Sequence, residues 1–128
     1  MSNRFAPLAL TAALLSSCVT VPPIAEDGSS EVRLGQRVNL GGPRVTPLRV
    51  LEDSRCPMEA RCIWAGRVRL EVRIELGSGT TVRELASDRP LQIADGQLEL
   101  LGTMPPTSTQ RTIAPGDYRF ALKFSGGL

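Results

Sequence analysis

The sequence predicts an all-β domain, folded as an antiparallel, immunoglobulin-like β-sandwich or as a partly open barrel of about six to seven strands. Two observations support this fold class: apolar and polar residues alternate with a period of two along several short segments, and Gly, Pro and Asp separate those segments. A third is that no segment after the first seventeen residues sustains the periodicity of an amphipathic helix.

The clearest strand covers residues 67–76, where five apolar residues alternate strictly with charged ones. The apolar positions are Val68, Leu70, Val72, Ile74 and Leu76. Charges of both signs on the other face indicate a solvated sheet surface. Gly77, Ser78 and Gly79 then separate this strand from residues 80–86, a spacing that predicts a tight β-hairpin.

A second strong candidate lies near the C-terminus, where large apolar side chains occupy every other position. These are Tyr118, Phe120, Leu122 and Phe124, and they predict a strand that faces the core. Weaker strand candidates are residues 32–40, 45–52 and 97–102, which Gly and Pro turns separate.

The first seventeen residues have the layout of a bacterial export signal. A short positive segment, residues 1–4, precedes eleven mostly apolar residues, 5–15, which are too few to span a bilayer as a helix. The segment ends in Leu-Ser-Ser-Cys at residues 15–18, which resembles the lipobox of bacterial lipoproteins. This resemblance implies cleavage before Cys18, acylation of its thiol and attachment to the membrane through the lipid. An ordinary signal peptide with a chance cysteine is the alternative.

The predicted organisation is therefore a lipoprotein signal peptide at 1–17, a lipidated Cys18 with a flexible tether at 18–30, and a single β-sandwich domain at 31–128. Residues 19–30 contain two consecutive prolines and a run of small and acidic residues, without apolar periodicity. Val19 follows the cysteine instead of aspartate. By the sorting rule of lipoproteins this implies the periplasmic face of the outer membrane, if the host is Gram-negative.

Cys56 and Cys62 remain as an even pair in an exported chain, which predicts a disulfide between them. A zinc site is not indicated, because zinc prefers four ligands and the sequence contains no histidine. A redox-active pair usually has two intervening residues, and here there are five.

The segment around these cysteines carries the most distinctive motif. Residues 53–57 read Asp-Ser-Arg-Cys-Pro, and residues 62–66 read Cys-Ile-Trp-Ala-Gly. The motif resembles that of a family of small, mostly uncharacterised bacterial secreted proteins and lipoproteins, and the proline-rich stretches at 104–106 and 113–119 resemble the same family more loosely. The resemblance implies an exported β-rich domain with no established activity.

Two interpretations of this segment stay open. As a structural anchor, Asp53 accepts backbone hydrogen bonds, Arg55 pairs with a carboxylate, and Trp64 packs on the disulfide as in immunoglobulin-like cores. As a recognition loop, the disulfide holds an exposed tip. The candidate recognition residues are Asp53, Arg55, Pro57, Met58, Glu59, Arg61 and Trp64.

The residue content argues against catalysis and against nucleic-acid binding. Ser-His and Cys-His arrangements need a histidine, and no motif brings two carboxylates together in stated roles. With 15 basic and 13 acidic side chains, the sequence has no basic stretch typical of a nucleic-acid interface. We therefore expect no enzyme activity, no cofactor, no metal and no nucleic acid.

The leading hypothesis is a non-enzymatic envelope lipoprotein that presents its disulfide-stapled domain for structural use or for binding an envelope protein. Two alternatives are inhibition of an envelope or foreign hydrolase by insertion of residues 57–61, and an ion or small-ligand module. The latter would use Asp53, Asp88, Asp95 or Asp117, although no calcium-loop spacing is present.

Overall fold

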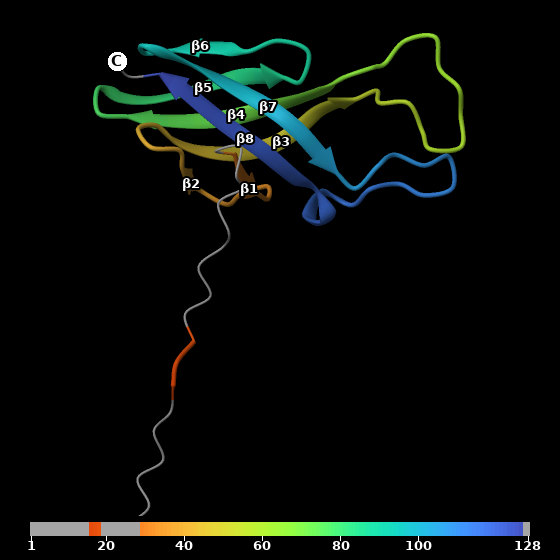
Figure 1. Cartoon of the computed structure of the whole chain (residues 1–128), viewed down its shortest axis with the longest axis horizontal. Helices are drawn as coiled ribbons and strands as arrows, with labels where there is room; N and C mark the ends of the chain where they lie inside the picture. The colour runs from red at the N-terminus through yellow and green to blue at the C-terminus, as the bar shows by residue number, and fades with distance from the viewer. Residues whose placement is uncertain (1–15, 19–28, 127–128) are drawn as a thin grey trace, which may run out of the picture.

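The computed structural model of the chain describes residues 16–18 and 29–126, and within them it forms two four-stranded antiparallel sheets (Figure 1). One sheet has the order β1-β8-β7-β6 and the other β2-β3-β4-β5. The two sheets do not close into a barrel, so the predicted all-β class is confirmed in its sandwich form.

The described residues form eight strands, three of them only two or three residues long. In chain order they are β1 (Ser30–Val32), β2 (Val38–Asn39), β3 (Arg44–Asp53), β4 (Val68–Leu76), β5 (Gly79–Ala86), β6 (Leu91–Ile93), β7 (Gly96–Met104) and β8 (Arg119–Gly126). A single 3-10 turn, η1 (Pro115–Asp117), precedes β8.

The core lies between the sheets and follows the period-two pattern of the sequence. In β4 the apolar positions from Val68 to Ile74 are fully buried, whereas the charged residues between them are half-buried or exposed. The predicted hairpin is confirmed: β4 pairs with β5 from Arg69 with Ala86 to Leu76 with Gly79, so the connection is the two-residue turn Gly77-Ser78.

The predicted C-terminal core strand is also confirmed. Phe120 and Leu122 of β8 are fully buried, and Phe124 is half-buried against the same core. Tyr118, directly before β8, stacks on Phe120 with ring centroids 5.6 Å apart.

The weaker strand candidates at 45–52 and 97–102 fall within β3 and β7, but the candidate at 32–40 is wrong as a single strand. Its two ends form β1 and β2, which belong to different sheets. The break comes at Gly35, which has a φ of +78° and donates its N–H to the carbonyl of Pro47 at 2.7 Å. The short strand β6 was not predicted.

Most of the predicted signal peptide and most of the predicted tether fall on residues 1–15 and 19–28, outside the described residues. Cys18 is described, and its thiol is free and exposed. Ser29 is buried and β1 begins at Ser30, so the sandwich begins there. Within residues 16–18 and 29–126, no helix has the length and apolar character needed to cross a membrane.

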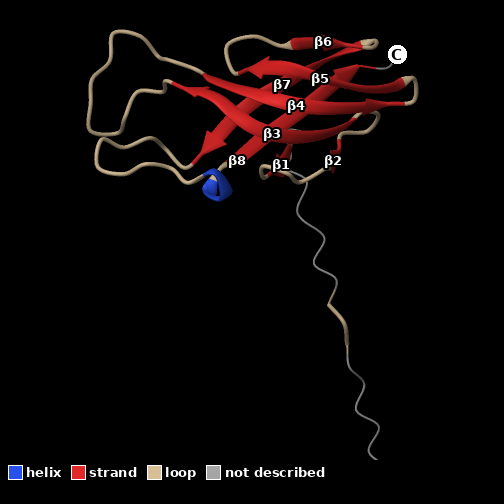
Figure 2. Cartoon of the chain, turned by 180° about the vertical axis from the view of Figure 1, so that it is seen from behind, coloured by secondary structure: helices blue, strands red, loops and turns tan. Residues whose placement is uncertain are grey.

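Two long loops project from one end of the sandwich, and the β4–β5 hairpin lies at the other end (Figures 1 and 2). We call residues 54–67, between β3 and β4, the cysteine loop, and residues 105–118, between β7 and β8, the proline loop. Together they form the loop end of the domain.

Candidate functional site

The cysteine loop and the proline loop are joined by hydrogen bonds although they come from different sheets. The N–H of Met58 donates to the carbonyl of Thr107 at 2.9 Å. The Thr107 hydroxyl in turn donates to the carbonyl of Arg55 at 3.1 Å. The two loops are therefore connected to each other directly as well as through the sheets.

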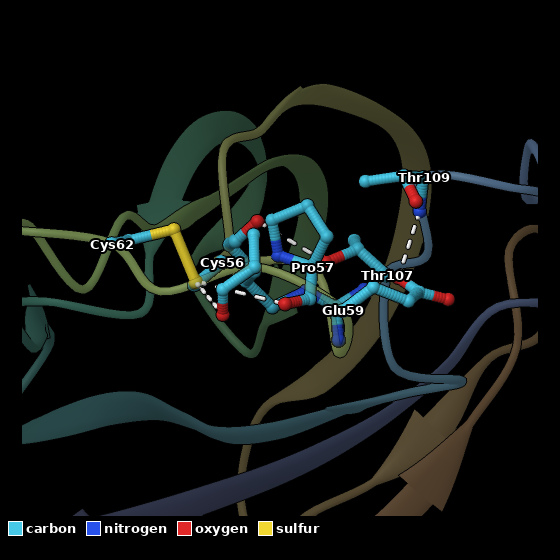
Figure 3. Close-up of a disulfide and its surroundings, with 8 residues drawn as sticks. Cys56, Pro57, Glu59, Cys62, Thr107 and Thr109 are labelled. Atoms are coloured by element: carbon cyan, nitrogen blue, oxygen red, sulfur yellow. Dashed lines mark hydrogen bonds between the residues drawn. A yellow bond between two sulfur atoms is a disulfide. The ribbon is translucent and has the colours of Figure 1, made fainter.

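Cys56 and Cys62 form the predicted disulfide, with Cα atoms 5.8 Å apart (Figure 3). Within the ring that it closes, the N–H of Ala60 donates to the carbonyl of Pro57 at 3.0 Å. This bond makes residues 57–60 a β-turn. The tip of the ring is thus a closed turn with a defined shape.

Glu59 lies in this turn and links it to the neighbouring loop. Its carboxylate accepts a 2.6 Å hydrogen bond from the Ser108 hydroxyl. It also accepts a 3.0 Å bond from the N–H of Thr109 (Figure 3). These bonds lower the pKa of Glu59, because they stabilise the ionised carboxylate. Glu59, one of the predicted recognition residues, therefore already has hydrogen-bond partners within the domain.

The cysteine loop is closed at its base by paired hydrogen bonds between Ser54 and Arg67. The N–H of Ser54 donates to the Arg67 carbonyl at 2.9 Å, and the N–H of Arg67 donates to the Ser54 hydroxyl at 3.0 Å. Gly66 lies against this base with a φ of +67°, and a Cβ there would overlap the carbonyl of Ser54. Only glycine can both adopt this left-handed backbone conformation and lie so close to the Ser54 carbonyl.

At the base of the two loops, Asp53, Arg55 and Tyr118 form a mostly buried polar network that connects the two sheets. Arg55 donates two hydrogen bonds of 2.8 Å to the Asp53 carboxylate and a third, also of 2.8 Å, to the carbonyl of Thr103 in β7. The predicted pairing of Arg55 with a carboxylate is confirmed. Tyr118 donates its hydroxyl to Asp53 at 2.9 Å.

The electrostatics of this network follow from burial and from these bonds. Burial raises the pKa of the Asp53 carboxyl, but the hydrogen bonds from Arg55 and Tyr118 and the charge of Arg55 outweigh it, so the pKa is lowered overall. Hydrogen bonding to Asp53 raises the pKa of Arg55. Burial, together with the bond to Asp53, raises the pKa of Tyr118 to about 12. Asp53 and Arg55 thus hold the base of the loops in place. Their side chains are mostly buried and are not part of the exposed surface proposed for recognition.

The outer surface of the cysteine loop carries apolar side chains in solvent. Ile63 is 93% exposed, Trp64 is 82% exposed and Met58 is 57% exposed. The prediction that Trp64 packs on the disulfide as a core tryptophan is therefore wrong, because the loop extends past the ends of both sheets and no strand covers it. Met104, where β7 meets the proline loop, is also exposed. Among the described residues, three of the six large exposed apolar side chains thus belong to the loop end and a fourth, Met104, directly precedes it, the other two being Val82 and Leu101.

The predicted recognition residues divide into two groups. Asp53, Arg55, Pro57 and the exposed Glu59 shape and hold the loops, whereas the exposed side chains of Met58, Arg61 and Trp64 make no hydrogen bond or ion pair among the described residues. Arg61 makes no ion pair within the described part of the chain. Ile63, the most exposed of the apolar residues, was not selected from the sequence. The signal that could have indicated its exposure was its position beside Cys62, outside any strand pattern.

Residues 16–18 and 29–126 contain no cluster of three or more metal-ligating side chains, so the ion-binding alternative has no such cluster in this part of the chain. Comparisons of the chain with protein-family models, with curated proteins and with solved structures find no match.

Proposed function

We propose that this chain is a lipid-anchored, non-enzymatic protein of a bacterial cell envelope, and that its domain acts by binding through the exposed residues Arg61, Ile63 and Trp64. The observation that supports this most is the location of Ile63 and Trp64 in solvent, on a loop fixed at several points. Two adjacent and almost fully exposed apolar side chains add little burial to the fold, and contiguous exposed apolar groups are typical of interaction sites.

The contacts of the loop make it suited to binding. The disulfide, the Ser54–Arg67 base and the bonds to Thr107 hold the cysteine loop before any ligand arrives. A preorganised loop loses less conformational entropy on binding than a mobile one. Large aromatic side chains and arginine contribute most of the binding energy in many interfaces.

The anchor part of the proposal rests on the sequence before the domain. The lipobox-like residues at 15–18 support acylation of Cys18, and two or more acyl chains give stable membrane attachment. Val19 supports the periplasmic face of the outer membrane in a Gram-negative host. Cys18 is described as exposed, which is compatible with its modification.

The hydrolase-inhibitor hypothesis has weaker support. Substrate-like insertion would present residues 57–61 as an extended segment, but residues 57–60 form a turn and Glu59 is bonded to the proline loop. The two most exposed apolar residues, Ile63 and Trp64, come after Cys62, and Met58 alone of the large exposed apolar residues lies between the cysteines.

A photo-crosslinking residue incorporated at Ile63 of the full chain, expressed in a lipoprotein-processing bacterium, tests the proposed contact surface. The matched control is the same residue at Val82 of β5, an exposed apolar position at a distance from the loops in the sequence and in the sheet. We expect discrete covalent adducts from position 63 and few from position 82. Equal yields from both positions would contradict the proposal.

A further inference from the structure

We propose that the surface bound by the loop end is the lipid bilayer that holds the acyl chain, with Trp64 and Ile63 inserted into its interfacial region. This inference rests on the proposed function, since it uses both the anchor at Cys18 and the exposed end of the cysteine loop. The partner that contacts the loop end is then a membrane and not a protein.

The place where the chain enters the sandwich permits this contact. Ser30, the first residue of β1, pairs with Leu122 of β8. Leu122 lies three residues from Arg119, where β8 leaves the proline loop. At about 3.3 Å per residue, the chain enters roughly 10 Å from the base of the loop end.

The covalent length from the anchor to the domain is also sufficient. Twelve peptide units connect Cys18 to Ser30, and fully extended they span at most about 40 Å. An anchor in the bilayer therefore leaves the loop end free to touch the same bilayer. Because both are in one molecule, even a weak contact is populated, as the tether keeps the local concentration of membrane high.

The side chains at the loop end match the chemistry of a membrane interface. Tryptophan is enriched at the level of the lipid headgroups, and the Ile63 side chain adds apolar area beside it. Arg61 and Arg111, one in each loop, are exposed and make no ion pair among the described residues. Arginine side chains are long enough to keep their charge at lipid phosphates while the apolar residues insert.

The acidic groups of the loop end are offset by basic ones. The Asp53 carboxylate is paired with Arg55, and the exposed, ionised Glu59 is balanced by the exposed Arg61 two residues further along the same loop. Asp117 lies in η1, at the β8 end of the proline loop.

The way in which Ile63 and Trp64 are exposed favours contact with lipid over contact with a protein surface. Ile63 and Trp64 are adjacent and almost fully exposed, so they project from the domain and do not line a hollow. A protein would need a complementary pocket to bury them. A bilayer interface accepts projecting apolar side chains without shape complementarity.

Quenching of Trp64 fluorescence tests the inference directly, because Trp64 is the only tryptophan of the chain. The acylated protein, purified from membranes, is reconstituted into vesicles of phosphatidylethanolamine and phosphatidylglycerol, with and without brominated acyl chains. The matched control is the double variant Trp64→Phe/Val82→Trp, which moves the fluorophore to an exposed position on β5. We expect a blue-shifted emission and at least a twofold stronger quenching for Trp64 than for the control.

Quenching of Trp64 no greater than that of the control would overturn the inference. If acylation is present and Trp64 is not quenched, only the membrane contact fails, and adducts with a protein from position 63 would then identify a protein partner. If acylation is absent and Trp64 is still quenched by the added vesicles, the anchor of the proposed function fails and the membrane contact stands. If acylation of Cys18 and quenching of Trp64 are both absent, the lipid anchor and the membrane contact are both overturned.

Discussion

The hydroxyl of Tyr118 lies 2.9 Å from Oδ2 of Asp53 and donates a hydrogen bond to it across the interface between the two sheets. Asp53 ends β3 in one sheet, and Tyr118 directly precedes β8 in the other. The bond fixes the start of the cysteine loop against the end of the proline loop. The exposed residues of the loop end therefore depend on a polar contact that is itself almost completely buried.

Titration of Tyr118 should make the domain less stable in alkali. The pKa of Tyr118 in the folded protein is about 12, above the value of about 10 for an unfolded chain. The folded state thus holds the phenol proton more tightly, and its contribution to stability is complete below about pH 10 and is lost as the pH rises towards 12. Converted through linkage, this difference in pKa predicts that the unfolding free energy falls by about 2 kcal/mol over this range.

Because Tyr118 is the only tyrosine, the phenolate absorbance of the folded protein reports this single group. Its midpoint should lie near 12. The variant Tyr118→Phe should lack the alkaline loss of stability assigned to this group. A midpoint near 10 in the folded protein would show that the phenol is not held by Asp53.

Replacement of the Asp53 carboxylate should destabilise the domain at neutral pH. In Asp53→Asn the Arg55 side chain, which is 20% exposed, keeps its mostly buried surroundings but loses its anionic partner. We expect a loss of about 2–3 kcal/mol in the free energy of unfolding, measured by denaturant titration near neutral pH.

The pKa of Asp53 is lowered in the folded protein, so its stabilising effect is present above the unfolded value of 3.8 and disappears as the pH falls through the folded value. The difference between the wild-type chain and Asp53→Asn should therefore shrink in strong acid. A difference that stays constant from neutral pH to about pH 2 would exclude an ionic role for this carboxylate.

The base of the cysteine loop should tolerate no side chain at position 66. In Gly66→Ala the new Cβ would overlap the Ser54 carbonyl and the residue would keep a positive φ. We expect a loss of about 3 kcal/mol, measured by thermal or denaturant unfolding. Gly41 has a φ of +83° with open space around its Cα, so Gly41→Ala should cost only about 1 kcal/mol. Equal effects of the two substitutions would mean that the close contact at Ser54 is unimportant.

The disulfide should matter more for the loop than for the whole fold. The cysteines are six residues apart, and the entropy of so short a ring corresponds to about 2 kcal/mol. We expect Cys56→Ser/Cys62→Ser to fold with a modest shift in its denaturant midpoint and to be cut faster by protease within residues 57–66. Loss of the folded state would show instead that the bridge is essential to the sandwich.

The strands that the sequence predicted well are those whose two faces meet different surroundings. In β4, burial on one side and solvent on the other impose a strict alternation that is visible without a structure. The segment at 32–40 has a similar composition, but Gly35 turns the chain so that its halves join different sheets. A two-residue strand such as β2 is set by its partner β3 and not by its own residues.

In the candidate site, too, some features could be predicted from the local sequence and others could not. The disulfide and the Arg55–carboxylate pair followed from residue chemistry and short spacing. The exposure of Trp64 did not, because a tryptophan beside a disulfide has the same local sequence whether a sheet covers it or not. The bonds of Glu59 to Ser108 and Thr109 join residues about fifty positions apart, and no local pattern indicates such a pairing.

Mass spectrometry of the protein purified from the membranes of a lipoprotein-processing bacterium tests the central claim, that this is a lipid-anchored domain, most directly. We predict an N-terminus at Cys18 that carries acyl chains, together with a peptide in which Cys56 is joined to Cys62. A chain that retains residues 1–17, or that starts elsewhere with an unmodified Cys18, would contradict the lipid anchor.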